Sequence, residues 1–259
     1  MTERTSYEPG TPSWVDLSTP DLQDALRFYR GLFGWEFEDA GEEAGHYHQA
    51  LLRGKRIAGL APAQPGGPPG AFWTTYLTGS DVDAHAQAIR DAGGQVAFGP
   101  MDVMGQGRML IGQDPTGAGF GIWQPQAHTG AGLVAENATM TWNELLTRDL
   151  EAAVAFYGAV FGLTFEELPE DPGGYRLMKV GDDVVGGIWR MSDEVPQEVP
   201  PHWMAYFQLD DVDAGFERVR ELGGEVLREP IDSPYGRFAP VRDPQGATFS
   251  LIRAATPGG

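Results

Sequence analysis

The chain lacks cysteine, long apolar runs and an ordinary share of basic residues. The absence of cysteine excludes disulfides, thiolate catalysis and sulfur metal ligands, and it fits a reducing compartment. With 18 Lys and Arg against 37 Asp and Glu, the formal net charge is −19, which repels nucleic acid phosphates and anionic lipid surfaces. We therefore expect neither nucleic acid nor membrane as a partner.

No stretch approaches the roughly 20 apolar residues needed to cross a bilayer, and residues 1–12 lack the features of a signal peptide. The sequence therefore predicts a cytoplasmic protein. A chain of 259 residues can form one large domain or two of ordinary size. Composition does not decide between them.

An internal repeat shows that the chain forms two domains. Landmarks of the first half recur 128 residues later, and further landmarks recur after small changes in loop length. The matched residues are Trp14, Asp21, Tyr29, Gly34, Trp73, Tyr76, Arg108 and Asp114 in the first copy, and Trp142, Asp149, Tyr157, Gly162, Trp203, Tyr206, Arg237 and Asp243 in the second. We predict a flexible segment at 1–10, a first domain at 11–127, a small-residue linker at 128–136, a second domain at 137–254 and a tail at 255–259.

Each copy contains a strand, a helix and further strands, twice over. Residues 21–34 place apolar side chains at helical spacing between an Asp that can cap the helix and a Gly that can end it, and residues 149–162 do the same. Further helices are expected to begin near Asp81 and Asp211. The sequence predicts an α+β fold of four βαβββ units, paired within two tandem domains.

This unit, with Phe28-Tyr29 and Phe33-Gly34 in its helix and the late turn from Asp243 to Gly246, resembles the vicinal oxygen chelate superfamily. That superfamily includes glyoxalase I, bleomycin- and fosfomycin-resistance proteins and extradiol dioxygenases. The resemblance covers the chain from Trp14 to Ile252 and implies a curved mixed sheet around a cup in each domain. More narrowly, the stretches from Trp14 to Asp21 and from Asp114 to Ala118 resemble a two-domain actinobacterial branch often labelled glyoxalase-like or hydroxylase-like.

The resemblance also implies where metal ligands of such proteins would stand. These positions hold Trp14, Thr74, Gly121, Trp142, Met204 and Ser250, with Gly59 and Gly187 near the remaining inward strand ends. They supply neither the imidazoles nor the carboxylates that a divalent ion requires. We therefore expect no metal and no other cofactor, which argues against the metal-dependent activities of the superfamily.

Strand alternation places Trp14 and Asp16 on one face of the first strand and Val15 and Leu17 on the other. Trp142 and Glu144 hold the same positions in the second copy. A cup lined by an indole and a carboxylate suits a flat, partly aromatic small molecule that donates a hydrogen bond. The alternative interpretation is that Trp14 and Trp142 plug the space of the metal site.

Asp16 and Glu144 are also the candidate catalytic residues, because a carboxyl desolvated beside Trp has a raised pKa and can transfer protons. Arg108 and Arg237 are candidates for binding a ligand carboxylate or for pairing with Asp16 and Glu144. Further ligand-binding candidates, for which a structural role is the alternative, are Trp73, Trp203, Tyr76, Tyr206 and His202. His46 and His48 share a strand face without a visible third metal ligand.

Three classes of function remain. The first is metal-independent binding of a hydrophobic or aromatic small molecule, as in the bleomycin-resistance proteins that the chain resembles. The second is a glyoxalase-like lyase or isomerase, or a hydroxylase-like enzyme, that uses acid-base carboxylates. The third is a protein-interaction module. We expect a monomer or a weak homodimer, since tandem domains can form within one chain the contacts that single-domain relatives make by dimerising.

Overall fold

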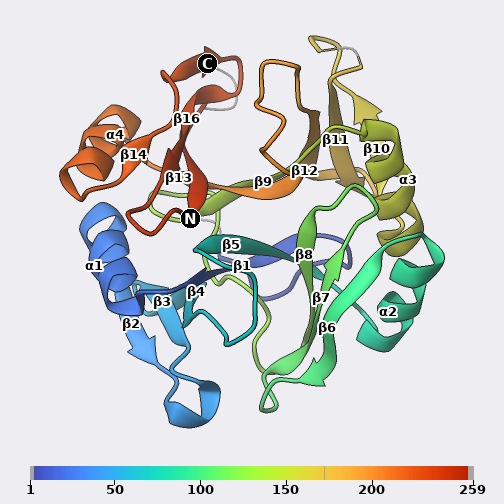
Figure 1. Cartoon of the computed structure of the whole chain (residues 1–259), viewed down its shortest axis with the longest axis horizontal. Coiled ribbons are helices and arrows are strands. Elements are labelled where there is room, and N and C mark those ends of the chain that lie inside the picture. The colour runs from blue at the N-terminus through green and yellow to red at the C-terminus, as the bar shows by residue number, and fades with distance from the viewer. Residues whose placement is uncertain (1–2, 172, 256–259) are drawn as a thin grey trace.

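The computed structural model describes residues 3–171 and 173–255. Two strongly curved mixed sheets make up the molecule, one from each sequence repeat, and two pairs of helices lie at their outer sides (Figure 1). In each sheet the first strand of one βαβββ unit pairs antiparallel with the first strand of the next, as β1 pairs with β5 and β9 with β13. The predicted α+β fold with tandem domains is confirmed.

The first sheet has the strand order β2-β3-β4-β1-β5-β8-β7-β6. Its strands and helices, in chain order, are β1 Pro12–Thr19, α1 Leu22–Phe33, β2 Glu36–Asp39, β3 His48–Leu52, β4 Lys55–Pro62, β5 Phe72–Thr78, α2 Val82–Asp91, β6 Gln95–Asp102, β7 Gly107–Gln113 and β8 Gly119–Pro125. A short 3₁₀ helix covers Glu42–Ala44.

The second sheet repeats this order as β10-β11-β12-β9-β13-β17-β16-β14, and β15 pairs with β16. Its elements are β9 Met140–Thr147, α3 Leu150–Phe161, β10 Thr164–Glu167, β11 Tyr175–Val180, β12 Asp183–Arg190, β13 His202–Gln208, α4 Val212–Glu221, β14 Glu225–Val226, β15 Ile231–Ser233, β16 Gly236–Arg242 and β17 Thr248–Ala254.

The helix ends follow the predicted local chemistry. The carboxylate of Asp21 accepts a hydrogen bond from the Asp24 amide at 3.0 Å, and Gly34 ends α1 with a φ of 73°. Asp149 and Gly162 do the same for α3. An Asp at the N-cap satisfies an amide that the helix leaves unpaired, and Gly adopts the left-handed conformation without steric strain.

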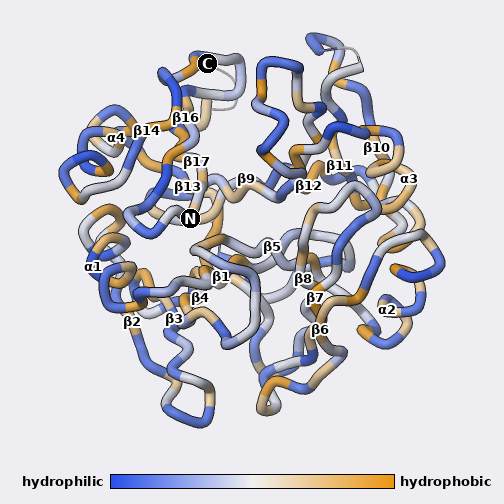
Figure 2. Tube along the Cα trace, viewed as in Figure 1, coloured by the Kyte–Doolittle hydropathy of each residue, from blue (hydrophilic) through white to orange (hydrophobic). Residues whose placement is uncertain are grey.

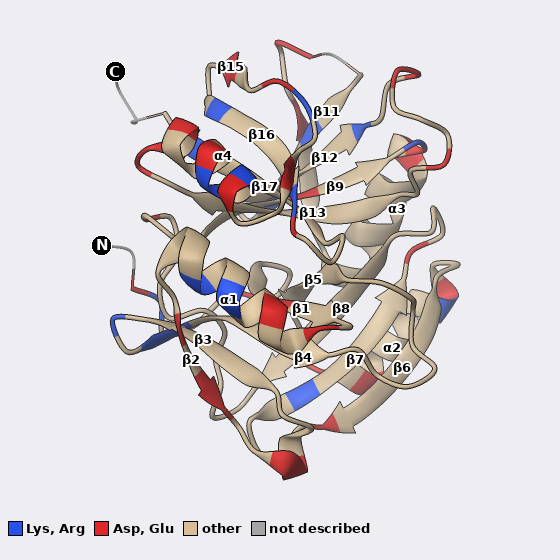
Figure 3. Cartoon of the chain, turned by 60° about the vertical axis from the view of Figure 1, so that its left-hand side comes forward, with Lys and Arg blue, Asp and Glu red and all other residues tan. Residues whose placement is uncertain are grey.

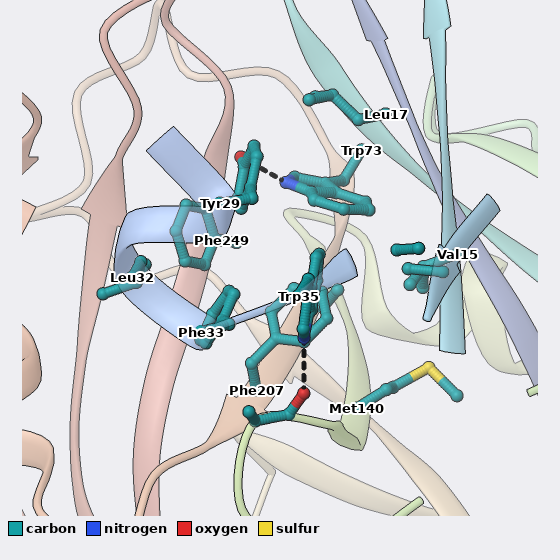
Figure 4. Close-up of a cluster of buried hydrophobic side chains, with 14 of the residues drawn as sticks. Val15, Leu17, Tyr29, Leu32, Phe33, Trp35, Trp73, Met140, Phe207 and Phe249 are labelled. Carbon is teal, nitrogen blue, oxygen red and sulfur yellow. Dashed lines mark hydrogen bonds between the residues drawn. The ribbon is translucent and has the colours of Figure 1, made fainter. Parts of the chain in front are cut away.

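The buried core crosses the boundary between the domains. Helix α1 of the first domain lies beside α4 of the second, and α2 lies beside α3 (Figure 1). The ring of Phe33 lies 5.2 Å from that of Phe207, and Trp35 donates a hydrogen bond from Nε1 to the carbonyl of Ala138 at 2.8 Å (Figure 4). The loops at the periphery are largely hydrophilic (Figure 2). The two domains therefore share their cores.

Two buried tyrosines link each helix to the turn of the other domain. Tyr29 donates to Asp243 at 3.0 Å, and Tyr157 donates to Asp114 at 3.1 Å. Each tyrosine oxygen in turn accepts from an indole, that of Trp203 in the case of Tyr157. The turns that contain these aspartates are therefore structural, as expected, and they also hold the domains together.

Replacing Tyr157 with Phe is expected to lower the free energy of unfolding by about 2 to 3 kcal/mol, because Asp114 and the Trp203 indole both lose a buried partner. Urea unfolding measures this change. The matched variant is Tyr235→Phe, whose ring is 53% exposed and which should change stability by less than about 0.5 kcal/mol. Equal effects of the two variants would contradict the proposed bridge.

The linker between the domains lies along the first sheet. The amides of Ala131 and Gly132 donate to the carbonyls of Ser13 and Arg56, and Tyr7 donates to the carbonyl of Ala131 at 2.6 Å. Glu3, Arg4 and Tyr7, in the segment for which flexibility was expected, therefore contact the linker. Residues 256–259 of the expected tail lie outside the described residues. Within residues 3–171 and 173–255, no helix has the length and apolarity to cross a membrane.

Candidate functional site in the two cups

Each sheet presents a concave face on which the first strand of the domain places an indole and a carboxylate. On β1, Val15 and Leu17 point into the core with no exposed surface, so Trp14 and Asp16 point to the other side. This confirms the predicted alternation. Asp16 lies opposite Thr74 of β5 and Gly59 of β4 in the register of the sheet. The carboxylate therefore lies at the centre of the cup.

Two tyrosines complete the first cup. Trp14 donates from Nε1 to the hydroxyl of Tyr47 at 2.9 Å, and Tyr47 donates to Asp16 at 3.4 Å. Tyr76 donates to the same carboxyl group. Burial raises the pKa of Asp16 to about 7, and the hydrogen bonds from Tyr76 and Tyr47 only partly oppose this shift.

The second cup repeats this arrangement. Trp142 donates to the hydroxyl of Tyr175 at 3.2 Å, and Tyr206 donates to Glu144 at 2.9 Å. Burial raises the pKa of Glu144, and hydrogen bonds from Tyr175 and Tyr206 oppose the shift. An indole, a carboxyl and two phenols thus occur together in both halves of the chain.

Sequence reasoning missed Tyr47 and Tyr175. Each stands twelve residues before a cup glycine, and a Cβ atom at Gly59 or Gly187 would overlap the tyrosine hydroxyl. The signal was present, because the tyrosine and the glycine recur together in both copies. It was not recognised, because Tyr47 precedes β3 and strand alternation does not place its side chain. The side chain lies over Gly59, where any larger residue would clash with it.

The side chains at the expected metal positions do not fit a divalent ion. The ring of Tyr76 covers Gly121 so closely that a Cβ atom there would overlap it, and Tyr47 covers Gly59 in the same way. Among the described residues, no three His, Asp or Glu side chains come together. Beside indoles and phenols, each cup contains one carboxyl and one imidazole, that of His128 in the first and of His202 in the second. These are fewer ligands than the imidazole and carboxylate sets of metal-dependent enzymes supply.

The arginines lie on the other face of the sheets. Arg108 forms an ion pair with Asp83 of α2, and Arg237 forms one with Asp213 of α4 through Nε at 2.9 Å. Figure 3 shows many of the acidic residues on the outer loops and helices. The expected pairing of Arg108 with Asp16 and of Arg237 with Glu144 is therefore wrong. Neighbouring residues of a strand point to opposite faces of the sheet, and both arginines occupy positions that point away from the cup.

The tryptophans of β5 and β13 also leave the cups. Trp73 and Trp203 are 7% and 4% exposed and donate to the hydroxyls of Tyr29 and Tyr157 at 3.0 and 2.9 Å. Of the alternatives given for them, the structure places both in the core between the domains. Tyr76 and Tyr206 stand three residues further along the same strands, on the opposite face, and lie opposite Trp14 and Trp142 in the cups.

The histidines differ in position. His202 lies on the cup face of β13, two residues before Met204, and its Nδ1 lies 2.8 Å from the carbonyl of Pro200. Burial lowers its pKa. His46 lies outside the strands in a turn and pairs with Asp39, while His48 begins β3. The two therefore do not share a strand face.

The linker contributes His128 to the first cup. Its ring lies 4.4 Å from that of Trp14 and 5.3 Å from that of Trp123, and the side chain is 7% exposed. Burial and, second to it, the charge of Arg56 lower the pKa of His128 to about 4, so the imidazole is neutral at neutral pH. His128 fills the Trp14 end of the first cup.

The fold and these sites define a member of the Glyoxalase/Bleomycin resistance protein/Dioxygenase superfamily, to which the chain belongs: the sequence pattern of this superfamily matches residues 11–122 and 138–251. "Putative glyoxylase CFP32" of Mycobacterium tuberculosis is 45% identical over 98% of this chain and 99% of its own length. "Anthracycline biosynthesis protein DnrV" of Streptomyces peucetius is 38% identical over 96% of this chain and 94% of its own length.

A solved structure is similar in fold. The Mn(II)-bound glyoxalase from Novosphingobium aromaticivorans superposes with a TM-score of 0.65 at 16% identity, covering 95% of this chain and 82% of that one. At this identity the likeness shows the fold alone. Proteins of one fold carry many functions, which are set by the side chains of each site.

Proposed function

We propose that the protein binds a flat, oxygenated aromatic small molecule in a cup and does so without a metal. The observation that carries this proposal is the duplicated group of an indole, a carboxyl and two phenols on the concave faces. Aromatic rings supply apolar contact area, and a carboxyl of raised pKa can either accept or donate a hydrogen bond near neutral pH.

The relatives support the same class of ligand. One of them is named an anthracycline biosynthesis protein, and anthracyclines are fused aromatic ring systems that carry hydroxyl and carbonyl oxygens. The superfamily name includes bleomycin resistance proteins. Both are consistent with a cup that takes a small organic molecule.

The test is a titration with quinizarin (1,4-dihydroxyanthraquinone), followed by quenching of tryptophan fluorescence. We expect saturable quenching, because Trp14 and Trp142 lie in the cups, and we expect EDTA to change the Kd by less than about twofold. Elemental mass spectrometry of the same samples reports bound metal. Loss of binding in EDTA together with about one metal ion per chain would overturn metal independence.

An acid-base enzyme is the second candidate, favoured by the pKa of about 7 at Asp16. A carboxyl of this pKa can take a proton from a carbon acid or return one to an oxygen, as in a lyase or isomerase. The neighbouring groups are already hydrogen-bonded to one another, which favours binding over catalysis. Mass spectrometry and NMR of quinizarin-like ligands after incubation decide, since an unchanged ligand supports binding alone.

A further inference from the structure

The two cups share their aromatic groups but differ in the row of side chains that contains the carboxylate. Four residues lie side by side across neighbouring strands in each sheet. In the first cup they are Gln49, Gly59, Asp16 and Thr74; in the second they are Leu177, Gly187, Glu144 and Met204. Two polar side chains of the first row are thus apolar in the second.

This difference changes how completely the row is covered. Asp16 and Thr74 are both partly exposed as residues. Glu144 is only 9% exposed, and Met204, in the place of Thr74, is 5% exposed. The carboxyl groups of both cups are buried, but the row in the second cup is covered more fully, by an apolar side chain where the first row has Thr74.

The first cup also contains buried polar atoms without partners. The Oε1 atom of Gln49 is buried and accepts no hydrogen bond from the described residues. The Nε2 atom of His128 is also buried and has no hydrogen-bond partner among them. No such atom occurs among the described residues of the second cup, where Leu177 replaces Gln49. A buried polar group without a partner destabilises a protein, so its presence in one cup only requires an explanation.

We propose that the first cup alone is the ligand site, and that it takes an aromatic molecule whose hydroxyl or N–H group donates to Gln49. This assignment rests on the proposed function. Asp16 and Thr74 offer further hydrogen-bonding groups beside Gln49, and Phe72 and Tyr47, both partly exposed, offer ring surfaces. His128 packs against Trp14 at one end, so the proposed site lies toward Phe72.

The second cup then has a structural role. Its carboxyl is satisfied by tyrosine hydroxyls, and Met204 packs with Tyr206 and Ile252 in a small apolar cluster. This packing stabilises the sheet and puts apolar side chains where the first row has the hydrogen-bonding groups of Gln49 and Thr74. One chain therefore binds one ligand.

The test exchanges the two rows. The pair Gln49→Leu with Thr74→Met gives the first cup the side chains that the second cup already accommodates in the same positions. We expect the Kd for quinizarin to rise at least roughly tenfold, since two hydrogen-bonding groups are lost. The reciprocal pair Leu177→Gln with Met204→Thr should leave the Kd within about twofold, and calorimetry of the wild-type protein should give one site per chain.

Thermal unfolding supplies a readout that needs no ligand. Gln49→Leu should raise the Tm by roughly 2 °C, because it removes an unpaired buried amide, whereas Leu177→Gln should lower it. A lower Tm for Gln49→Leu would mean that the amide has a partner within the protein and would overturn the proposal. Binding that survives in the first-cup pair, or is lost in the second-cup pair, overturns the assignment alone. Absence of quinizarin binding to the wild-type protein overturns the proposed function as well.

Discussion

Replacing Trp35 with Ala is expected to lower the free energy of unfolding by about 3 to 5 kcal/mol, the range for removing a large aromatic side chain from a core. The indole is 1% exposed and stacks on Phe33 and Tyr29 at ring distances of 4.6 and 5.7 Å. It also contacts Phe207 of the second domain and donates to Ala138 (Figure 4). The substitution therefore weakens one core and the interface between the domains together.

Thermal unfolding should show this as a fall in Tm of roughly 10 °C, at about 2 to 4 °C for each kcal/mol in a chain of this size. The matched variant is Trp142→Ala, which removes an indole that is partly exposed in the second cup. Its effect should be less than half as large. If both variants lowered the Tm equally, Trp35 would not hold the domains together as its contacts indicate.

The repeat and its periodicity were sufficient to predict the four βαβββ units, because each helix carries its own cap and terminator. They could not predict which surfaces meet. The apolar side of the first helix identifies Phe28 and Tyr29 as buried, but helical spacing does not reveal that their partners belong to the second domain. Trp35 was also missed, because Leu163 occupies its place in the second copy and the comparison of copies did not mark it.

The candidate site was predicted in part. Strand alternation placed Asp16 and Glu144 in the cups, since the period of two is a local property of a strand. The partners of these carboxyls depend on register between strands and on the path of loops. Tyr47 and the linker residue His128 reach the first cup by such paths. The recurrence of Tyr47 as Tyr175 could have indicated the tyrosine, whereas no pattern in the sequence indicates His128.

Replacing Asp16 with Asn is expected to stabilise the protein in alkaline solution. The pKa of Asp16 rises from 3.8 to about 7 on folding, so the folded protein keeps its proton at pH values where the unfolded chain has lost it. The wild-type protein therefore loses stability as the pH rises from about 4 through 7. The Asn variant lacks this titration and can still accept the hydrogen bonds of Tyr47 and Tyr76.

We expect the stability advantage of the variant to grow by roughly 3 kcal/mol between pH 5 and pH 8.5, at about 1.4 kcal/mol for each pKa unit. Urea unfolding of both proteins at several pH values measures this difference, in which the titration of all other groups cancels. Asp193→Asn, on an exposed loop, is the control for replacing a carboxylate with an amide. A flat profile for Asp16→Asn would mean that the carboxyl is already ionised in the folded protein at pH 5. A steep profile would mean that the protein retains a destabilising carboxyl in the first cup, which is typical of residues kept for binding or catalysis rather than for stability.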